Sequence, residues 1–222
     1  TCAKRTTNGH GHDRLPAVTP RVAAIVEQCW HRVPGGTATS AVRTLAAIQR
    51  RAEWNVVGVA ASHRTPPSAV AVPTVPVVHS RLPRRALYES WQRFRRPSMP
   101  RSVGKVDVVH ATGGVVPPPG DARLVVTVHD LAFLHRPEHF TKHGVRFMTR
   151  GFELAKQEAA QILVPSQTTA DDCVAHGADV ERISVVPWGA DPVAVTDQDR
   201  ARVRAAHGLP DEFVLWLGTA EP

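Results

Sequence analysis

The sequence predicts an α/β fold, a doubly wound, Rossmann-like parallel sheet with helices on both faces. Short apolar runs of strand length alternate along the chain with segments of helical periodicity, as in folds that alternate strands and helices. Two of these runs, Val106–His110 and Leu124–Val128, are predominantly apolar, which is typical of central parallel strands covered on both faces. Right-handed crossovers then place a ligand site at the carboxyl ends of the strands.

The composition is that of a folded protein. Of the 222 residues, 42% are apolar and 21% are charged, close to the averages for globular domains. The length allows roughly one to one and a half domains. The longest apolar runs, such as Val22–Val26, are far shorter than the roughly 18 residues that a membrane-spanning helix needs. No basic start leads into an apolar signal segment either.

The net charge of +7 does not by itself identify a partner. Arginine outnumbers lysine 23 to 4 amid many Ala, Val and Pro residues, a bias that we attribute first to a GC-rich bacterial genome rather than to polyanion binding. The basic residues are scattered and are not interleaved with aromatic residues, as a stacking surface for bases requires. We therefore expect no nucleic-acid partner.

The first half of the chain predicts a tail, three strands and two helices. Residues 1–20 lack apolar periodicity and are expected to form a flexible tail, in which the His10–Asp13 cluster lacks the preorganised geometry of a metal site. The expected strands are Val22–Cys29, Asn55–Ala60 and Thr74–His79, and the expected helices are Thr37–Arg51 and Arg84–Arg96. The proline-rich segment Gly113–Gly120 is expected to be irregular.

The second half of the chain continues the alternation of strands and helices, and its last segment follows a different pattern. Thr141 is expected to cap a long helix with one apolar stripe, and Ser166 a helix that stops at Gly177. The expected elements that follow the long helix are the strands Ile162–Pro165 and Ile183–Val186, the helix Asp197–His207 closed by Gly208, and an apolar strand Phe213–Leu217. That last strand lacks a partner in an isolated domain. We therefore expect one domain over residues 21–190, and a linker helix with the first strand of a truncated second domain over residues 191–222.

The cysteines indicate a reducing compartment. Cys2, Cys29 and Cys173 show no CxxC spacing, and an odd number leaves at least one thiol unpaired under any disulfide scheme. We therefore expect all three to be reduced and the protein to be cytoplasmic.

A glycine pair opens the first predicted helix. Gly35, Gly36 and Thr37 follow the first strand, and bare backbone N–H groups at a helix N-terminus favour phosphate. The pair belongs neither to a GxGxxG fingerprint nor to a loop that ends in GK[ST], so dinucleotide binding and direct ATP chemistry are not expected. A glycine pair is also common in an ordinary turn, and this alternative stays open.

A histidine follows one of the two central strands. His129 comes directly after Leu124–Val128, with Asp130 beside it, so its imidazole is expected at the mouth of the sheet. Such a histidine can bond a sugar hydroxyl or help to transfer a proton. The alternative is a histidine that only fixes the loop.

The helix expected at Arg84–Arg96 has two interpretations. Leu87, Trp91 and Phe94 lie near one face, and several arginines supply positive charge, which suggests a helix that rests on an anionic membrane. The same apolar residues can equally pack on the sheet. We favour packing, because the helix lies between two core strands.

Three stretches of the sequence resemble glycosyltransferase family 4, the retaining enzymes with two facing Rossmann-like domains called the GT-B fold. The first two are Val106–Thr112 and Thr127–Phe133, the second being similar to the family's strand-end histidine loop. The third and most specific runs from Ala155 to Asp191 and ends in a Val-Val-Pro-Trp-Gly-Ala-Asp motif. Residues 217–222 also resemble the family's first strand of the second domain.

The resemblance implies transfer of a sugar from a nucleoside diphosphate donor to an acceptor hydroxyl, with retention of configuration, no cofactor and no bound metal. It places Gly35, Gly36 and Thr37 at the donor phosphates and His129 at the transferred sugar. It assigns Asp130, Ser166 and Thr169 to the acceptor side, where the acceptor is a glycan, lipid or small molecule. Because the family's donor-gripping residues lie in the second domain, we expect an incomplete enzyme, inactive alone. The alternative is a non-catalytic remnant that binds a glycan or phospholipid.

Overall fold

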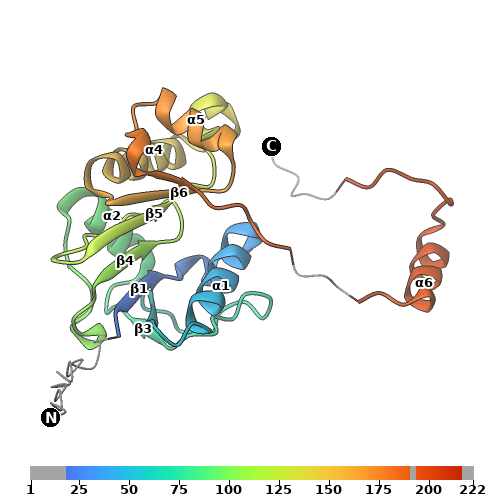
Figure 1. Ribbon diagram of the computed structural model, residues 1–222, viewed down its shortest axis with the longest axis horizontal. Helices are drawn as coiled ribbons and strands as arrows, with labels where there is room; N and C mark the ends of the chain where they lie inside the picture. The colour runs from blue at the N-terminus through green and yellow to red at the C-terminus, as the bar shows by residue number, and fades with distance from the viewer. Residues whose placement is uncertain (1–18, 191–193, 217–222) are drawn as a thin grey trace, which may run out of the picture.

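A single parallel sheet organises the chain. The computed structural model describes residues 19–190 and 194–216. Its seven strands, all parallel, lie in the order β3-β2-β1-β4-β5-β6-β7 (Figure 1). They are β1 (Arg21–Ile25), β2 (Asn55–Ala60), β3 (Val77–His79), β4 (Val108–Ala111), β5 (Arg123–Thr127), β6 (Gln161–Val164) and β7 (Ile183–Val185). The predicted fold class is confirmed.

Helices follow most of the strands in the described part of the chain. They are α1 (Gly35–Gln49), α2 (Arg84–Phe94), α3 (Ala132–His135), α4 (Lys142–Glu158), α5 (Gln167–Ala175) and α6 (Asp197–His207). Short 3₁₀ turns interrupt the loops, the first of them at Glu27–Trp30. Gly113–Gly120 contains no helix or strand, as predicted.

The sheet is covered on both faces, because successive strand residues point to opposite sides. On β1, Val22 and Ala24 pack in one core cluster with residues of α1, including Leu45. Ala23 and Ile25 pack in another cluster with Leu87 and Trp91 of α2. Helices α1 and α2 therefore lie on opposite faces of the sheet.

Side-chain caps start three of the helices where the sequence predicts them to begin. Thr141 accepts a hydrogen bond from the Gly144 N–H at the start of α4, and Ser166 accepts one from the Thr169 N–H at the start of α5. A capping box at Thr196 begins α6. Each cap satisfies an N–H group that a helix leaves without an internal partner.

The first predicted strand is too long. The prediction ran to Cys29, whereas β1 ends at Ile25 and the chain then turns into the 3₁₀ segment. The reason is a tertiary contact: Glu27 is 1% exposed, and its Oε2 accepts a 2.7 Å hydrogen bond from the Ala61 N–H beyond β2. The apolar residues continue through Val26, but the 3₁₀ segment directs the Glu27 carboxylate into the interior.

The last predicted strand is wrong in its described part. Residues 213–216 form no strand, and Val214, Leu215 and Trp216 are exposed. A strand needs a hydrogen-bonded neighbour, and none lies beside these residues in the described part of the chain. Leu217, the expected tail over residues 1–18 and residues 191–193 lie outside the described residues. The division at residue 190 stays a prediction.

Helix α2 packs on the sheet, as we favoured. Leu87 and Trp91 are 1% exposed, whereas Phe94 is 70% exposed. The Trp91 Nε1–H donates to the Pro97 carbonyl at 2.8 Å. No helix within residues 19–190 and 194–216 is long and apolar enough to cross a bilayer.

Candidate functional site

The direction of the chain reverses across the middle of the sheet. From β1, the chain runs outward through β2 to β3 and then crosses back to β4 on the other side of β1. Open parallel sheets bind ligands at such a switch point, outside the carboxyl ends of the strands. The start of α1 and the loop after β4 lie there, one from each side of the switch.

A pocket of about 190 Å³ lies at this edge. Its polar lining comes from Thr37 at the start of α1, from Thr127 at the end of β5, and from His129 and Asp130 after β5. Gly113 and Gly114 after β4 form part of the wall. Three loops that are far apart in the sequence therefore meet at one pocket, as the strand-end argument predicts.

The first turn of α1 leaves its backbone open. Gly35 adopts a left-handed φ of +61°, which favours glycine. A Cβ atom built on Gly35 or Gly36 would meet nothing within 4 Å. Of Gly35, Gly36 and Thr37, it is Thr37 that lines the pocket. Its Cγ2 lies 3.5 Å from a Cβ built on Gly113. Gly35 and Gly36 are exposed beside it.

His129 is held by a backbone bond and an aromatic ring. Its Nε2 lies 2.9 Å from the Thr112 carbonyl oxygen, which can only accept, so Nε2 carries the hydrogen and donates. In the neutral ring, Nδ1 then carries the lone pair. Trp188, just after β7, stacks on the imidazole with a centroid distance of 5.0 Å. The ring is fixed in orientation and its tautomer is defined.

Thr112 links this histidine to the switch point. The Thr112 hydroxyl donates to the Ile25 carbonyl at the end of β1 and accepts a 2.6 Å bond from Gln28 Nε2. Thr112 is 3% exposed and Gln28 is 6% exposed. Buried bonds therefore join the ends of β1 and β4 directly under the carbonyl that orients His129.

A second histidine lies behind the first. His110 on β4 is 5% exposed, and its Nε2 lies 2.9 Å from the Thr127 hydroxyl on β5. Burial, with a smaller contribution from the charge of His129, lowers the pKa of His110 from 6.5 to about 4. His110 is therefore neutral at physiological pH and acts as part of the strand pairing rather than as a charge.

The floor of the pocket depends on a glycine in α4. A Cβ atom built on Gly151 would lie 2.3 Å from the Gly114 carbonyl oxygen, which is far inside van der Waals contact. Met148 and Phe152 of the same helix also line the pocket. The absent side chain at Gly151 lets α4 approach the loop after β4.

The three predicted acceptor-side residues do not all lie together. Asp130 lines the pocket, and its Oδ1 accepts a 2.9 Å bond from the Ala132 N–H at the start of α3. Ser166 and Thr169 are 3.1 Å apart through their hydroxyls and form the cap of α5. Neither is among the described residues that line this pocket. Their acceptor-side role stays a prediction.

Sequence reasoning missed two groups at this edge. Trp188 occurs in the motif quoted above, but its contact with His129 depends on β7 ending at the same edge of the sheet. The other group is Glu27 with His63, whose Nε2 lies 2.9 Å from Glu27 Oε1. Trp30 stacks on His63 at 4.9 Å between centroids. Neither residue spacing nor periodicity signals that contact.

A larger hollow lies elsewhere. It measures about 1020 Å³ and is lined mostly by α2 and the segment 95–102. His79–Leu82 belong to it, but none of Thr37, His129 and Asp130 does. We place the site at the smaller pocket, because it adjoins the switch point and gathers the polar strand-end residues.

The cysteine environment agrees with reduced thiols where it is described. Cys29 and Cys173 are buried and free. Burial, followed by the charge of a neighbouring carboxylate, raises the pKa of each thiol to about 11. Both are therefore unreactive thiols of the core, and Cys2 lies outside the described residues.

Solved structures with a similar fold include a protein bound to UDP and sugar ligands. HepE from Anabaena in complex with UDP and glucose is similar at 15% identity and a TM-score of 0.55, covering 85% of this chain and 50% of that chain. The same protein in complex with UDP-glucose gives 16% identity, a TM-score of 0.55 and the same coverage. The chain therefore spans about half the length of these structures.

The sequence also matches a family model. No curated protein sequence matches the chain. The model of Glycosyltransferase Family 4 matches residues 34–194, well over half of the chain. The matched region includes α1, the residues of the pocket and the motif that contains Trp188. The chain belongs to glycosyltransferase family 4.

Proposed function

We propose that this chain is the acceptor-side half of a glycosyltransferase that moves a sugar from a nucleoside diphosphate to an acceptor hydroxyl, with retention of configuration. The observation that carries the proposal is the pocket at the switch point, lined by Thr37, His129 and Asp130 in a chain of this family. The full enzyme is expected to have a second domain facing this edge. We expect it to act in the cytoplasm and to need no cofactor.

The start of α1 suits the donor phosphates. The exposed N–H groups around Gly35 and Gly36 lie at the positive end of a 15-residue helix. The similar protein HepE has been solved with UDP and with UDP-glucose, which supports a nucleotide sugar as the ligand here. The missing side chains allow a diphosphate to approach the backbone.

His129 suits the transferred sugar. Its Nε2–H is engaged by Thr112, so the lone pair on Nδ1 is the feature that a sugar hydroxyl can donate to. Stacking by Trp188 limits rotation of the ring. The chain's contribution to catalysis is then alignment of the reactants, together with stabilisation of the departing diphosphate by the helix terminus.

An assay of nucleoside diphosphate release and of product formation tests the proposal. The protein translated from the complete reading frame is profiled with a set of nucleotide sugars and acceptors, and residues 1–222 are assayed beside it. We expect transfer from the complete protein and none from residues 1–222 alone. Turnover by residues 1–222 would overturn the expected incompleteness. Absence of transfer from the complete protein with every donor would overturn the function.

A non-catalytic lipid- or glycan-binding module is the second candidate. A groove of about 430 Å³ is lined by Phe94, Arg93, Arg146 and Arg150, so an exposed aromatic ring lies among cations. This combination suits the surface of an anionic membrane. Sedimentation with vesicles tests it: binding to anionic but not neutral vesicles, lost in Phe94→Ala, is expected for peripheral contact. Equal binding to anionic and neutral vesicles, or no binding to either, counts against contact with a membrane.

A further inference from the structure

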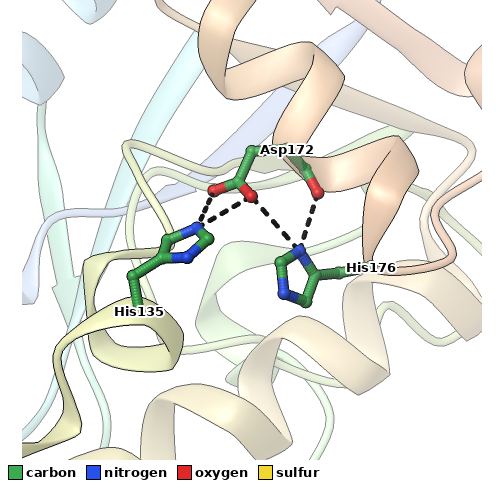
Figure 2. A group of neighbouring side chains, drawn as sticks. All are labelled: His135, Asp172 and His176. Atoms are coloured by element: carbon green, nitrogen blue, oxygen red, sulfur yellow. Dashed lines mark hydrogen bonds and ion pairs between the residues drawn. The ribbon is translucent and has the colours of Figure 1, made fainter.

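A group of three metal-ligating side chains lies outside the pocket. His135 ends α3, Asp172 belongs to α5, and His176 follows α5 (Figure 2). One potential ligand atom from each lies within 4.8 Å of the other two. We propose that His135, Asp172 and His176 form a binding site for Zn²⁺ or a similar transition-metal dication. This inference goes beyond the proposed sugar transfer and does not depend on it.

The distances from the Asp172 carboxylate to the two imidazoles are close to those in a tetrahedral zinc site. Zn–N and Zn–O bonds of about 2.1 Å place neighbouring ligand atoms roughly 3.3 Å apart. His135 Nε2 lies 2.8 Å from both carboxylate oxygens of Asp172, and His176 Nδ1 lies 3.2 Å from Asp172 Oδ1. Shifts on the order of 1 Å at side-chain tips adjust these distances, and the two imidazole nitrogens, which lie within 4.8 Å of each other, approach to roughly 3.3 Å when an ion binds.

The two imidazoles approach the carboxylate from different directions. Their rings are nearly perpendicular, with centroids 5.4 Å apart and an interplanar angle of 83°. Figure 2 shows one nitrogen of each ring pointing toward Asp172. Two nitrogens and one oxygen form a donor set that zinc prefers and that magnesium, which prefers oxygen, does not. A fourth position is left for water.

Binding through His176 requires little rearrangement. Its Nδ1 lies 2.9 Å from the Asp172 carbonyl oxygen, and this bond is lost when Nδ1 binds a metal. The same carbonyl also accepts from the His176 backbone N–H at 3.0 Å, so it keeps a partner. The side chains of His135 and Asp172 are 52% and 22% exposed, which lets an ion enter from solvent.

The site would connect two parts of the chain. Helix α3 starts immediately after Asp130 and Leu131, which line the pocket, and α5 follows β6. A bound ion would fasten the loop after β5 to α5. Lys156 lies near the far side, where its Nζ donates to the His176 carbonyl, and Glu153 lies 2.8 Å from that ammonium. The nearby positive charge is therefore paired.

Zinc titration of the 222-residue chain tests the proposal. The protein is stripped with EDTA, returned to metal-free buffer and titrated with Zn²⁺ against a chromophoric chelator. We expect one ion at this site, with affinity reduced on the order of 100-fold in His135→Ala and in His176→Ala, since even supporting residues contribute about 10- to 100-fold. A saturating excess of zinc should raise the Tm of the parent by about 5 °C but not that of these variants.

Two control variants separate this site from other histidines. His139→Ala removes an exposed imidazole four residues from His135, and the double variant His10→Ala/His12→Ala removes the pair near the N-terminus. Both should keep the zinc affinity and the Tm shift. The proposal is overturned if the parent binds no zinc at micromolar concentration, if His135→Ala and His176→Ala bind as the parent does, or if the double variant abolishes binding. An unchanged Tm in EDTA shows that each variant is folded.

Discussion

The carboxyl edge of the sheet contains a closed region and an open region. Above β1–β3, the large side chains Trp30, His63 and His79 contact one another through their rings, and the buried carboxylate of Glu27 lies beneath them. Above β4 and β5, glycines at positions 113 and 114 leave room beside His129. Both regions have histidines at strand ends. The difference teaches that strand-end histidines with large neighbours form ring contacts with them, whereas small neighbours leave space beside the histidine for a ligand.

The largest expected effect is the loss of His129 from the open region. Under the proposed function, His129→Ala in the complete enzyme should lower turnover by about 10²- to 10³-fold, or roughly 3–4 kcal/mol of barrier, because the variant removes the group proposed to lie at the reacting sugar. Steady-state kinetics measure it. His79→Ala is the control from the closed region and should keep turnover within about threefold. Equal losses in both variants would break the distinction between the regions.

Removal of Glu27 tests the closed region through stability. Glu27→Ala leaves the buried Ala61 N–H and the His63 ring without their acceptor, which should lower the free energy of unfolding by about 3 kcal/mol. Glu27→Gln keeps an oxygen acceptor and should cost about half as much. Urea unfolding measures both. A stable Glu27→Ala protein with reduced turnover would instead assign this region to catalysis.

The buried His110 should make stability depend on pH. Its pKa is about 4 in the folded protein and about 6.5 when unfolded. Between these values the unfolded chain binds the proton and the folded protein does not, so stability is complete above about pH 6.5 and falls by about 3 kcal/mol as the pH approaches 4. Unfolding curves of the parent and His110→Gln measure the difference. The same pH dependence of the free energy of unfolding in the parent and in His110→Gln would contradict the assignment to His110.

The smallest expected effect comes from the tryptophan over His129. Trp188→Ala removes the stacking ring and should lower turnover of the complete enzyme by about tenfold, because the imidazole gains rotational freedom. The free energy of unfolding should change by less than about 1 kcal/mol, since Trp188 is 44% exposed. Trp188→Phe keeps an aromatic face and should restore most of the rate. If Trp188→Phe restores none of the rate, the loss of stacking does not explain the effect of Trp188→Ala.

Much of the fold could be predicted because its signals are local. Predominantly apolar runs identified β4 and β5, and Thr141 and Ser166 supplied caps that need only neighbouring residues. The errors occurred where contacts between residues far apart in the sequence determine the local structure. Glu27 turns the chain because of Ala61 beyond β2, and residues 213–216 form no strand because strand formation depends on a neighbour.

The site could be predicted only in outline. His129, Asp130 and the start of α1 follow from the rule that parallel strands end at one edge. Trp188 on His129 and the group at His135, Asp172 and His176 require a three-dimensional arrangement. Helix α3, which carries His135, is four residues long, too short for periodicity to reveal.

The contact between Gly151 and the Gly114 carbonyl links cavity depth to helix spacing. Because no methyl group fits between them, any family member with a side chain at this position must hold its counterpart of α4 farther from the sheet. The volume of the pocket then depends on one residue in the middle of a helix.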